Sequence, residues 1–178
     1  MKTKQLIMCS IFAALSAVLS QLSIPIGPIP ISMTHVSIFL AAGLLGAKYG
    51  AVSQAVYALL GAVGAPVFTG LSGGFAIIAG PRGGFIIGYI ACAFISGFMI
   101  ERFGRSYKSL IASMYSGWVV TYIFGLSWFI FVTGTPLAES ISLCVLPFLP
   151  GDALKTILCA ALIIRLHPVL TKTIFSEK

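Results

Sequence analysis

The chain has 178 residues, of which 58% are hydrophobic and only 8% are charged, and its mean hydropathy is +1.06. Soluble domains carry roughly 25% charged residues, so this composition excludes a soluble domain and predicts one transmembrane domain over residues 1–178. The net charge of +7 does not indicate a nucleic-acid partner, because the basic residues are scattered between apolar segments. The sequence contains no G-x-x-x-x-G-K-[ST] motif, so the chain does not bind ATP by that route.

Apolar segments predict an all-α membrane protein with six transmembrane helices. The first follows a short basic start, and we interpret it as a retained helix rather than a signal peptide, because no clear cleavage site closes it. The second and third are short for a hydrocarbon core about 30 Å thick. A shallow seventh helix near Glu139–Leu149 is a further candidate. The six predicted spans are Leu6–Leu22, Thr34–Tyr49, Ala51–Val63, Gly84–Ile100, Leu110–Val132 and Asp152–Leu166.

The distribution of basic residues predicts the orientation of these helices. Nine lysines and arginines fall on one predicted face of the membrane, and only Arg82 falls on the other. Basic loops stay in the cytoplasm, so both termini are predicted to be cytoplasmic in a multi-pass protein of the cell membrane. The nine are Lys2, Lys4, Lys48, Arg102, Arg105, Lys108, Arg165, Lys172 and Lys178.

Two predicted external loops have unusual compositions. The segment Ile24–Ser32 is apolar and contains three prolines, so it can cover an apolar pocket without being a flexible linker. In Gly61–Gly84, eight of twenty-four residues are glycine, which allows the backbone to approach a ligand closely. This loop also contains Phe68, Phe75 and Arg82, which favours a binding role over an ordinary turn-rich connection.

Asp152 and Lys155 open the last apolar segment and lie three residues apart, which places them on one face of a helix. A full charge well inside a bilayer costs at least about 2.5–3.5 kcal/mol, so the pair predicts a polar ligand, a mutual ion pair, or both. The alternative is a structural pair that stabilises the start of the helix. For Arg82, the alternatives are a ligand contact and a contact with lipid headgroups.

Other residues carry weaker signals. Ala13 and Ala17 form a small-x-x-x-small pattern, which serves internal helix packing and partner docking equally well. The aromatic residues Trp118, Tyr122, Trp128 and Phe129 of the fifth span indicate core and interfacial belt rather than a cofactor site. The cysteines and the two histidines show no metal-ligand spacing, so neither a metal site nor a cofactor is predicted.

Several segments together form a recognisable signature, namely Pro30–Thr34, Tyr57, Gly61–Phe68, Gly73-Gly74, Gly80–Phe85 and Pro150–Lys155. They resemble the BioY family of biotin-transport proteins over most of the chain. The resemblance implies a substrate-capture (S) component of an energy-coupling-factor (ECF) transporter, with an external vitamin pocket. The chain departs from the family pattern at Ser32 and Thr34, where a Thr and a Gln are common, and at Arg82, where many members have Thr.

The resemblance implies a function and a set of partners. The chain would capture biotin on the outer face and deliver it inward with a transmembrane coupling subunit, contacted through Ala13 and Ala17, and two ATPase subunits. Alternatives are an S component for another small vitamin and a self-sufficient secondary transporter, although the halves show no internal repeat. Asp152 and Lys155 alone are too few for an intramembrane enzyme. The predicted substrate-binding residues are Asp152, Lys155, Arg82, Gly73, Gly74, Phe75 and Phe68.

Overall fold

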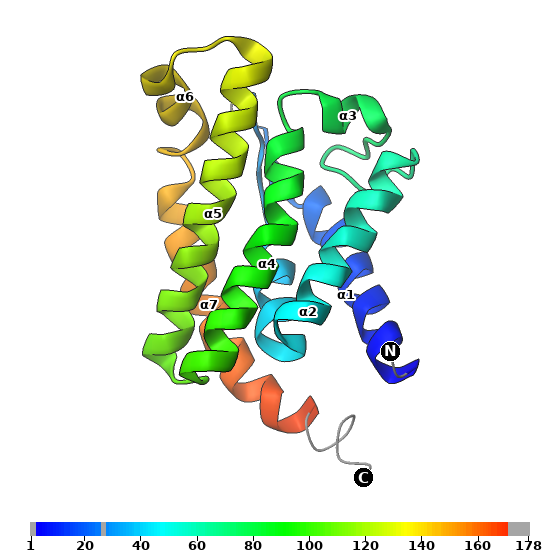
Figure 1. The fold of residues 1–178 in the computed structure, drawn as a ribbon, viewed down its shortest axis with the longest axis vertical. Helices are drawn as coiled ribbons and strands as arrows, with labels where there is room; N and C mark the ends of the chain where they lie inside the picture. The colour runs from blue at the N-terminus through cyan, green and yellow to red at the C-terminus, as the bar shows by residue number, and fades with distance from the viewer. Residues whose placement is uncertain (1–2, 26–27, 171–178) are drawn as a thin grey trace.

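The computed structural model describes residues 3–25 and 28–170, which form seven helices and one antiparallel pair of short strands (Figure 1). The strands β1 (Ser23–Ile24) and β2 (Ile31–Ser32) pair Ser23 with Ser32 and Ile24 with Ile31. The predicted all-α membrane fold is confirmed. The helices are α1 (Thr3–Gln21), α2 (Thr34–Ala62), α3 (Phe75–Ala79), α4 (Gly83–Phe103), α5 (Tyr107–Thr133), α6 (Leu137–Cys144) and α7 (Leu149–Leu170).

The helix count differs from the six that were predicted. Within the described residues, five helices are long and apolar enough to cross a membrane, namely α1, α2, α4, α5 and α7. The predicted spans Thr34–Tyr49 and Ala51–Val63 form one element, α2, which is kinked at Gly46. In Figure 1 the chain descends to this kink and then rises toward α3. The two remaining helices, α3 and α6, are short, and α6 overlaps the shallow seventh helix that was a candidate.

The kink in α2 is closed by two charged side chains from the end of α4 and the loop that follows it. Gly46 has φ +83°, which side chains rarely tolerate, and a Cβ there would overlap the Glu101 carboxylate. Glu101 accepts a hydrogen bond from the Ala47 amide (3.0 Å), and Arg105 donates one to the Gly43 carbonyl (3.1 Å). Glu101 therefore caps the start of the second half of α2, and Arg105 caps the end of the first half.

Replacing Glu101 by Ala should lower the free energy of unfolding by about 1 kcal/mol, because the Ala47 amide loses its acceptor at the kink. Thermal denaturation of the purified protein in detergent measures this as a fall in the melting temperature of roughly 2–4 °C. The matched control is Glu139→Ala in α6, an exposed carboxylate. An equal melting temperature for the two variants would contradict the capping role of Glu101.

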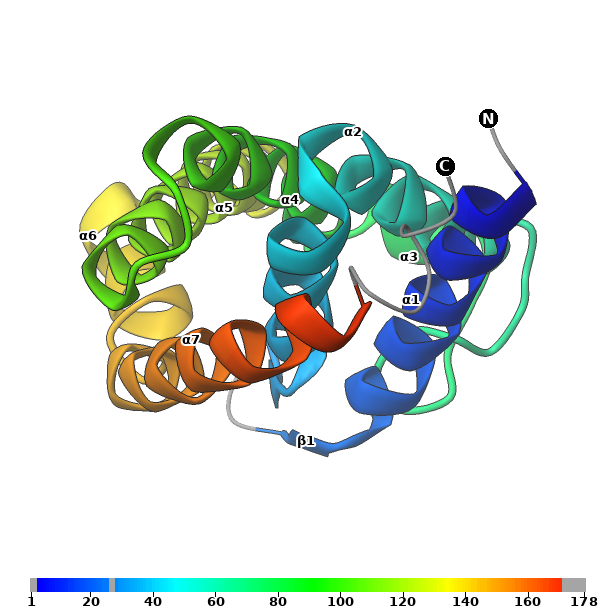
Figure 2. The ribbon, with the colours of Figure 1, turned by 90° about the horizontal axis from the view of Figure 1, so that it is seen from below.

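Packing is tightest where small residues let α4 approach its neighbours. Seen from below, α4 lies between α5 and α2 (Figure 2). A Cβ on Gly84 would lie 2.5 Å from the Phe124 carbonyl oxygen, and one on Gly88 would lie 3.3 Å from the Cα of Thr121. Gly84 and Gly88 therefore form the close-contact face of α4 toward α5, as small residues four apart do in membrane helices.

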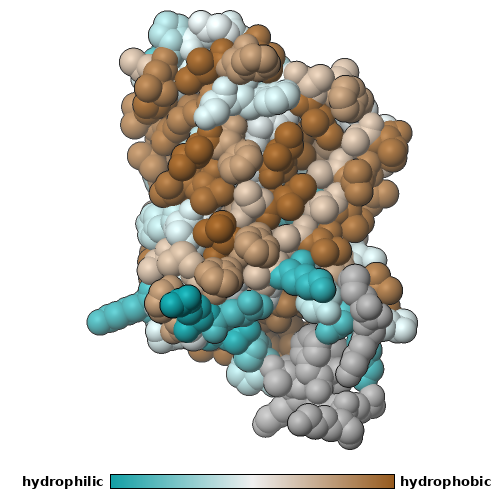
Figure 3. Space-filling view, viewed as in Figure 1, coloured by the Kyte–Doolittle hydropathy of each residue, from teal (hydrophilic) through white to brown (hydrophobic). Residues whose placement is uncertain are grey.

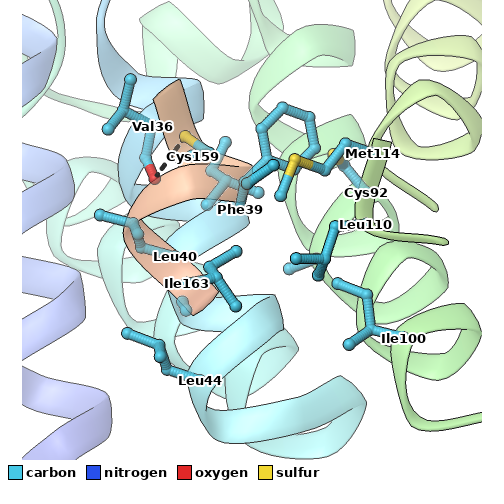
Figure 4. Packing of buried hydrophobic residues seen from close by; sticks show 14 of the residues in the cluster. Val36, Phe39, Leu40, Leu44, Cys92, Ile100, Leu110, Met114, Cys159 and Ile163 are labelled. Atoms are coloured by element: carbon cyan, nitrogen blue, oxygen red, sulfur yellow. Dashed lines mark hydrogen bonds between the residues drawn. The ribbon is translucent and has the colours of Figure 1, made fainter. Parts of the chain in front are cut away.

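The hydrophobic core lies among α2, α4, α5 and α7 (Figure 4). The thiol of Cys159 on α7 donates to the Val36 carbonyl on α2 (3.8 Å), which links the two helices. All four cysteines are buried and free, as small core residues. The labelled members of the core are Val36, Phe39, Leu40, Leu44, Cys92, Ile100, Leu110, Met114, Cys159 and Ile163.

The two ends of the bundle differ in polarity. Figure 3 shows hydrophilic residues gathered at the lower end, below a broad hydrophobic band. Helix α1 begins and α7 ends at this lower end, whereas α3 and α6 lie at the opposite end (Figure 1). Three of the nine basic residues predicted to lie on the cytoplasmic face, Lys2, Lys172 and Lys178, are outside the described residues. Arg102 and Lys108 are exposed, on either side of the α4–α5 connection.

Candidate functional site

The first turns of α7 carry a buried ion pair. Asp152 and Lys155 are only 3% and 5% exposed, and the Lys155 ammonium lies 3.4 Å from Asp152 Oδ1. As the spacing predicted, both lie on one face of the helix. The Tyr122 hydroxyl on α5 donates to Asp152 Oδ2. Because burial makes an unpaired charge costly, each member of this cluster depends on the others.

An indole ring holds the cluster in place from α5. Trp118 Nε1 donates to the Thr156 hydroxyl (3.1 Å), which donates to the backbone carbonyl of Asp152 (2.8 Å). The Lys155 ammonium lies 5.7 Å from the centroid of the Trp118 ring, within the range of a cation–π contact. Trp118 thus anchors the start of α7 through one hydrogen bond and faces the charge of Lys155 with its ring.

His35, in the first turn of α2, packs against the other side of this arrangement. Its ring stacks on Trp118, with centroids 3.8 Å apart and planes 26° apart, and meets Tyr89 of α4 edge-on at 5.0 Å. The side chain is 7% exposed. Among the residues that the structure describes, none forms a hydrogen bond with His35 Nε2.

These groups surround a small buried cavity of about 20 Å³. Lys155 and Tyr122 line it, whereas Asp152 lies behind them and holds both through hydrogen bonds. Since a single water needs about 10–15 Å³, the cavity is closed tightly around its lining. The lining residues are Ile29, Pro30, Ser32, His35, Phe85, Tyr89, Trp118, Thr121, Tyr122, Phe148 and Lys155.

A second cavity, of about 30 Å³, lies next to the first and contains the guanidinium-bearing residue Arg82 in its wall. Phe68 is buried there and meets Tyr57 edge-on, with ring centroids 5.5 Å apart. Its lining residues are Ile29, Pro30, Tyr57, Phe68, Thr69, Ile77, Arg82, Phe85, Ile86 and Tyr89.

The two cavities share Ile29, Pro30, Phe85 and Tyr89, which therefore form the partition between them. The two cavities differ in chemistry, since Arg82 lines one, and Lys155 and Tyr122, both bonded to Asp152, line the other. The predicted proline-rich loop supplies two members of the partition, which is consistent with a covering role.

The glycine loop contributes two of its predicted residues, Phe68 and Arg82, to these walls. In the described lining of the two cavities, Phe68 is present, whereas Gly73, Gly74 and Phe75 are absent. Phe75 begins α3 and is 72% exposed. A Cβ on Gly73 would lie 2.3 Å from the Ala65 carbonyl oxygen, and Gly74 has φ +104°, so both glycines shape the loop.

Helix α1 holds this loop against the rest of the bundle. Ser20 donates to the Val67 carbonyl (2.6 Å), and the Gln21 amide donates to the Phe68 carbonyl (3.1 Å). Gln21 also accepts from the Leu71 amide (2.8 Å). These bonds position Phe68 in the cavity wall, and the sequence offered no spacing that would have revealed them.

The small residues predicted for partner docking lie on the inner side of α1. Ala13 is 2% exposed and packs in a cluster with Tyr57 and Phe68, and Ala17 is partly buried against the same cluster. The small residues on the exposed side of α1 are Ser10 and Ala14. The pattern Ser10-x-x-x-Ala14 therefore has the same spacing on the outer face.

Trp118, Tyr122, Tyr89 and His35 were not predicted as site residues. Trp118 is part of the core, as its pattern indicated, but it lines the cavity as well. One signal was available, because Trp118 and Tyr122 lie four residues apart on one helical face and carry polar atoms. The residues around His35 in the sequence show no comparable pattern that would indicate a site residue.

Comparison with known proteins agrees with the resemblance seen in the motifs. The BioY family model matches residues 1–172. The biotin transporter BioY of Thermotoga maritima is 37% identical over 163 residues, which cover 92% of this chain and 95% of that protein. The probable biotin transporter BioY of Pyrococcus horikoshii is 38% identical over 155 residues, covering 87% and 91%.

A solved structure gives the same result for the fold. The crystal structure of the S-component for biotin from an ECF-type ABC transporter matches with a TM-score of 0.85 and 35% sequence identity. The match covers 94% of this chain and 92% of that one. With a family model over nearly the whole chain and relatives above 30% identity, this chain belongs to the BioY family.

Proposed function

We propose that this chain is the biotin-binding S component of an ECF-type vitamin transporter. The observation that carries the proposal is the pair of adjoining cavities, with Arg82 in the wall of one and the Asp152–Lys155–Tyr122 cluster at the other. Relatives that are named biotin transporters over almost the full chain support the choice of ligand.

Biotin has the matching chemistry at its two ends. Its ureido head offers two N–H donors and a carbonyl acceptor, and its valerate tail ends in a carboxylate. Lys155 can donate to the ureido carbonyl, and Asp152, which accepts from Lys155 and from the Tyr122 hydroxyl, fixes both groups or accepts a ureido N–H itself. Arg82 is the cation that suits the carboxylate, since a guanidinium binds carboxylates through paired hydrogen bonds. Phe68 and Phe85 supply apolar walls for the ring and the methylene chain.

Binding requires the partition between the cavities to open. Volumes of about 20 and 30 Å³ leave room for only a few waters, so the ligand must displace Tyr89, Phe85 or the loop containing Ile29 and Pro30. Ile29 and Pro30 come just before β2, whose partner strand β1 lies at one edge of the bundle (Figure 2). A loop that covers the ligand after entry would also exclude water, which strengthens the charge-assisted hydrogen bonds beneath it.

Transport needs energy from other chains. The sequence carries no Walker A motif, so we propose a transmembrane coupling subunit and two ATPase subunits as partners, with the whole assembly in the cell membrane. Biotin would enter from the outer face, at the end of the bundle opposite the basic one, and leave toward the cytoplasm. Biotin is then a transported substrate, and no cofactor is proposed.

The outer face of α1 offers a test of partner docking. Replacing the exposed Ala14 by Leu should reduce co-purification with the coupling subunit several-fold, because a larger side chain prevents close helix approach. Biotin binding by the isolated chain should be unchanged. The matched variant Ala17→Leu lies on the inner face, and it should instead lower the melting temperature through overpacking. If Ala14→Leu co-purifies normally with the coupling subunit and a folded Ala17→Leu does not, the docking surface is the Ala13–Ala17 face.

Titration of the purified, ligand-stripped protein with biotin in detergent tests the proposed function. Isothermal calorimetry should give tight one-to-one binding, and Trp118 fluorescence should change because the indole lines the cavity. Well-folded protein that binds no biotin would refute the choice of ligand. Competition with other small vitamins would then identify the alternative substrate.

A further inference from the structure

His35 has a buried ring nitrogen, Nε2, whose hydrogen-bonding capacity is unused within the described part of the chain. Its side chain is 7% exposed, and Nε2 has no hydrogen-bond partner within the described part of the chain. Buried polar atoms almost always have a partner, so an unsatisfied one in a native structure needs a reason. The His35 side chain lines the same cavity as Lys155 and Tyr122, so it belongs to the proposed ligand site.

The imidazole ring is held rigidly in this position. It stacks on Trp118 at 3.8 Å and meets the edge of Tyr89 at 5.0 Å, so two aromatic rings restrict its rotation. Trp118 itself is fixed by its hydrogen bond to Thr156. A nitrogen on such a supported ring is preorganised for a partner, because little side-chain freedom remains to be lost on binding.

The hydrogen-bonding capacity of the surrounding groups indicates which partner. Among the described residues, Lys155 donates one hydrogen bond, to Asp152, and an ammonium can donate three. Asp152 already accepts from Tyr122 and Lys155. Ser32 pairs with Thr34 (2.8 Å), and Thr121 donates to the Gly117 carbonyl. Lys155 therefore keeps two donors for a ligand, and the neutral His35 imidazole adds one acceptor, which is Nε2 in the tautomer with its hydrogen on Nδ1.

We propose that His35 is a further specificity-determining residue, whose Nε2 accepts a hydrogen bond from a ureido N–H of the bound ligand. This proposal rests on the proposed function, since the ureido group is that of biotin. A cyclic urea presents two N–H groups beside one carbonyl. Lys155 donates to the carbonyl and His35 accepts from one N–H group, while the other N–H group meets the Tyr122 oxygen or, once Tyr122 and Lys155 shift, the Asp152 carboxylate. His35 and Lys155 both pack on Trp118, so the indole sets the spacing between an acceptor and a donor.

His35→Phe tests the proposal because it keeps an aromatic ring against Trp118 and Tyr89 but removes the nitrogen. We expect at least about tenfold weaker biotin binding, the effect of leaving one ligand donor without an acceptor. The melting temperature of the unliganded protein should be equal or higher, because an unsatisfied buried polar atom is gone. His35→Gln, which restores an acceptor, should lose less affinity than His35→Phe. Desthiobiotin keeps the ureido group, so His35→Phe should weaken its binding by the same factor.

The outcomes separate this proposal from the function on which it rests. If wild-type protein binds no biotin, the proposed function fails and the role of His35 fails with it. If wild-type protein binds biotin and His35→Phe binds within about twofold of it, only the role of His35 is overturned. The role is also overturned if both variants lower the unliganded melting temperature in step with their loss of affinity, since His35 would then act in packing alone.

Discussion

Replacing Asp152 by Asn is expected to weaken biotin binding by roughly 30- to 5,000-fold, as measured by calorimetric titration. The substitution keeps the shape of the side chain but removes the charge that pairs with Lys155 (3.4 Å) and accepts from Tyr122. Breaking one side of a buried, hydrogen-bonded charge pair costs about 2–5 kcal/mol in other complexes. Part of this cost arises because the Lys155 ammonium stays buried without its counter-charge and is no longer held in place for the ligand.

Loss of one buried charge also threatens folding, so a second variant is needed. The double variant Asp152→Asn with Lys155→Met removes both charges, and buried pairs replaced in this way often leave stability unchanged. It should fold with a melting temperature near that of wild type and bind no biotin at accessible concentrations. A folded double variant with unchanged affinity would leave Asp152 and Lys155 as a structural pair at the start of α7.

Tyr122→Phe shows how the carboxylate acts. Asp152 lies behind Tyr122 and Lys155 in the wall of the cavity, so it can act through these two groups or touch the ligand once they shift. Unchanged affinity in Tyr122→Phe would indicate direct contact between Asp152 and the ligand. A loss close to that of Asp152→Asn would indicate that the tyrosine hydroxyl carries the effect.

The part of the site on α7 was predictable from the sequence because its geometry is local. Asp152 and Lys155 lie three residues apart on one helix, and helical periodicity alone places them together. His35 was not predictable in the same way, because its contacts with Tyr89 and Trp118 join three helices. A lone histidine in an apolar segment carries no sign of which distant ring it will stack on.

The glycine loop shows the same limit on a smaller scale. Its composition predicts that its aromatic residues lie near the ligand, and it does not distinguish Phe68 from Phe75. The structure separates them, because Ser20 and Gln21 of α1 bind the backbone around Phe68 and turn its ring inward. Phe75 begins α3 beyond that anchor and is exposed. Hydrogen bonds between segments that are distant in sequence made this choice.

The fold was predictable in class but not in its break points. Apolar segments and basic loops indicate the membrane helices, but they predict a break between Tyr49 and Ala51, whereas α2 breaks at Gly46. Either Gly46 or Gly50 can accept a positive φ. The position of the break depends on Glu101 at the end of α4 and on Arg105 just after it. These side chains bond to Ala47 and Gly43 on the two sides of the kink. A pattern read along one segment does not contain that information.

Arg82→Gln is expected to weaken biotin binding by roughly 10- to 150-fold, the loss of a hydrogen bond to a charged group of about 1.5–3 kcal/mol. The guanidinium residue lines the cavity next to Phe68 and Tyr89, and the ureido-binding groups line the other cavity. An elongated ligand with its head at Lys155 would therefore place its carboxylate at Arg82. Biotinamide, which has a neutral tail, should bind wild-type protein more weakly than biotin does and should lose little more in Arg82→Gln.

The matched control for that experiment is Arg102→Gln, an exposed arginine at the end of α4 far along the chain from the cavity. It should bind biotin and biotinamide as wild type does, which excludes a general effect of reduced positive charge. Equal losses for the two ligands in Arg82→Gln would mean that Arg82 does not meet the carboxylate. No loss for either ligand would return Arg82 to its other predicted role, a contact with lipid headgroups at the outer membrane surface. The charge of the ligand tail thus decides between the two roles of this residue.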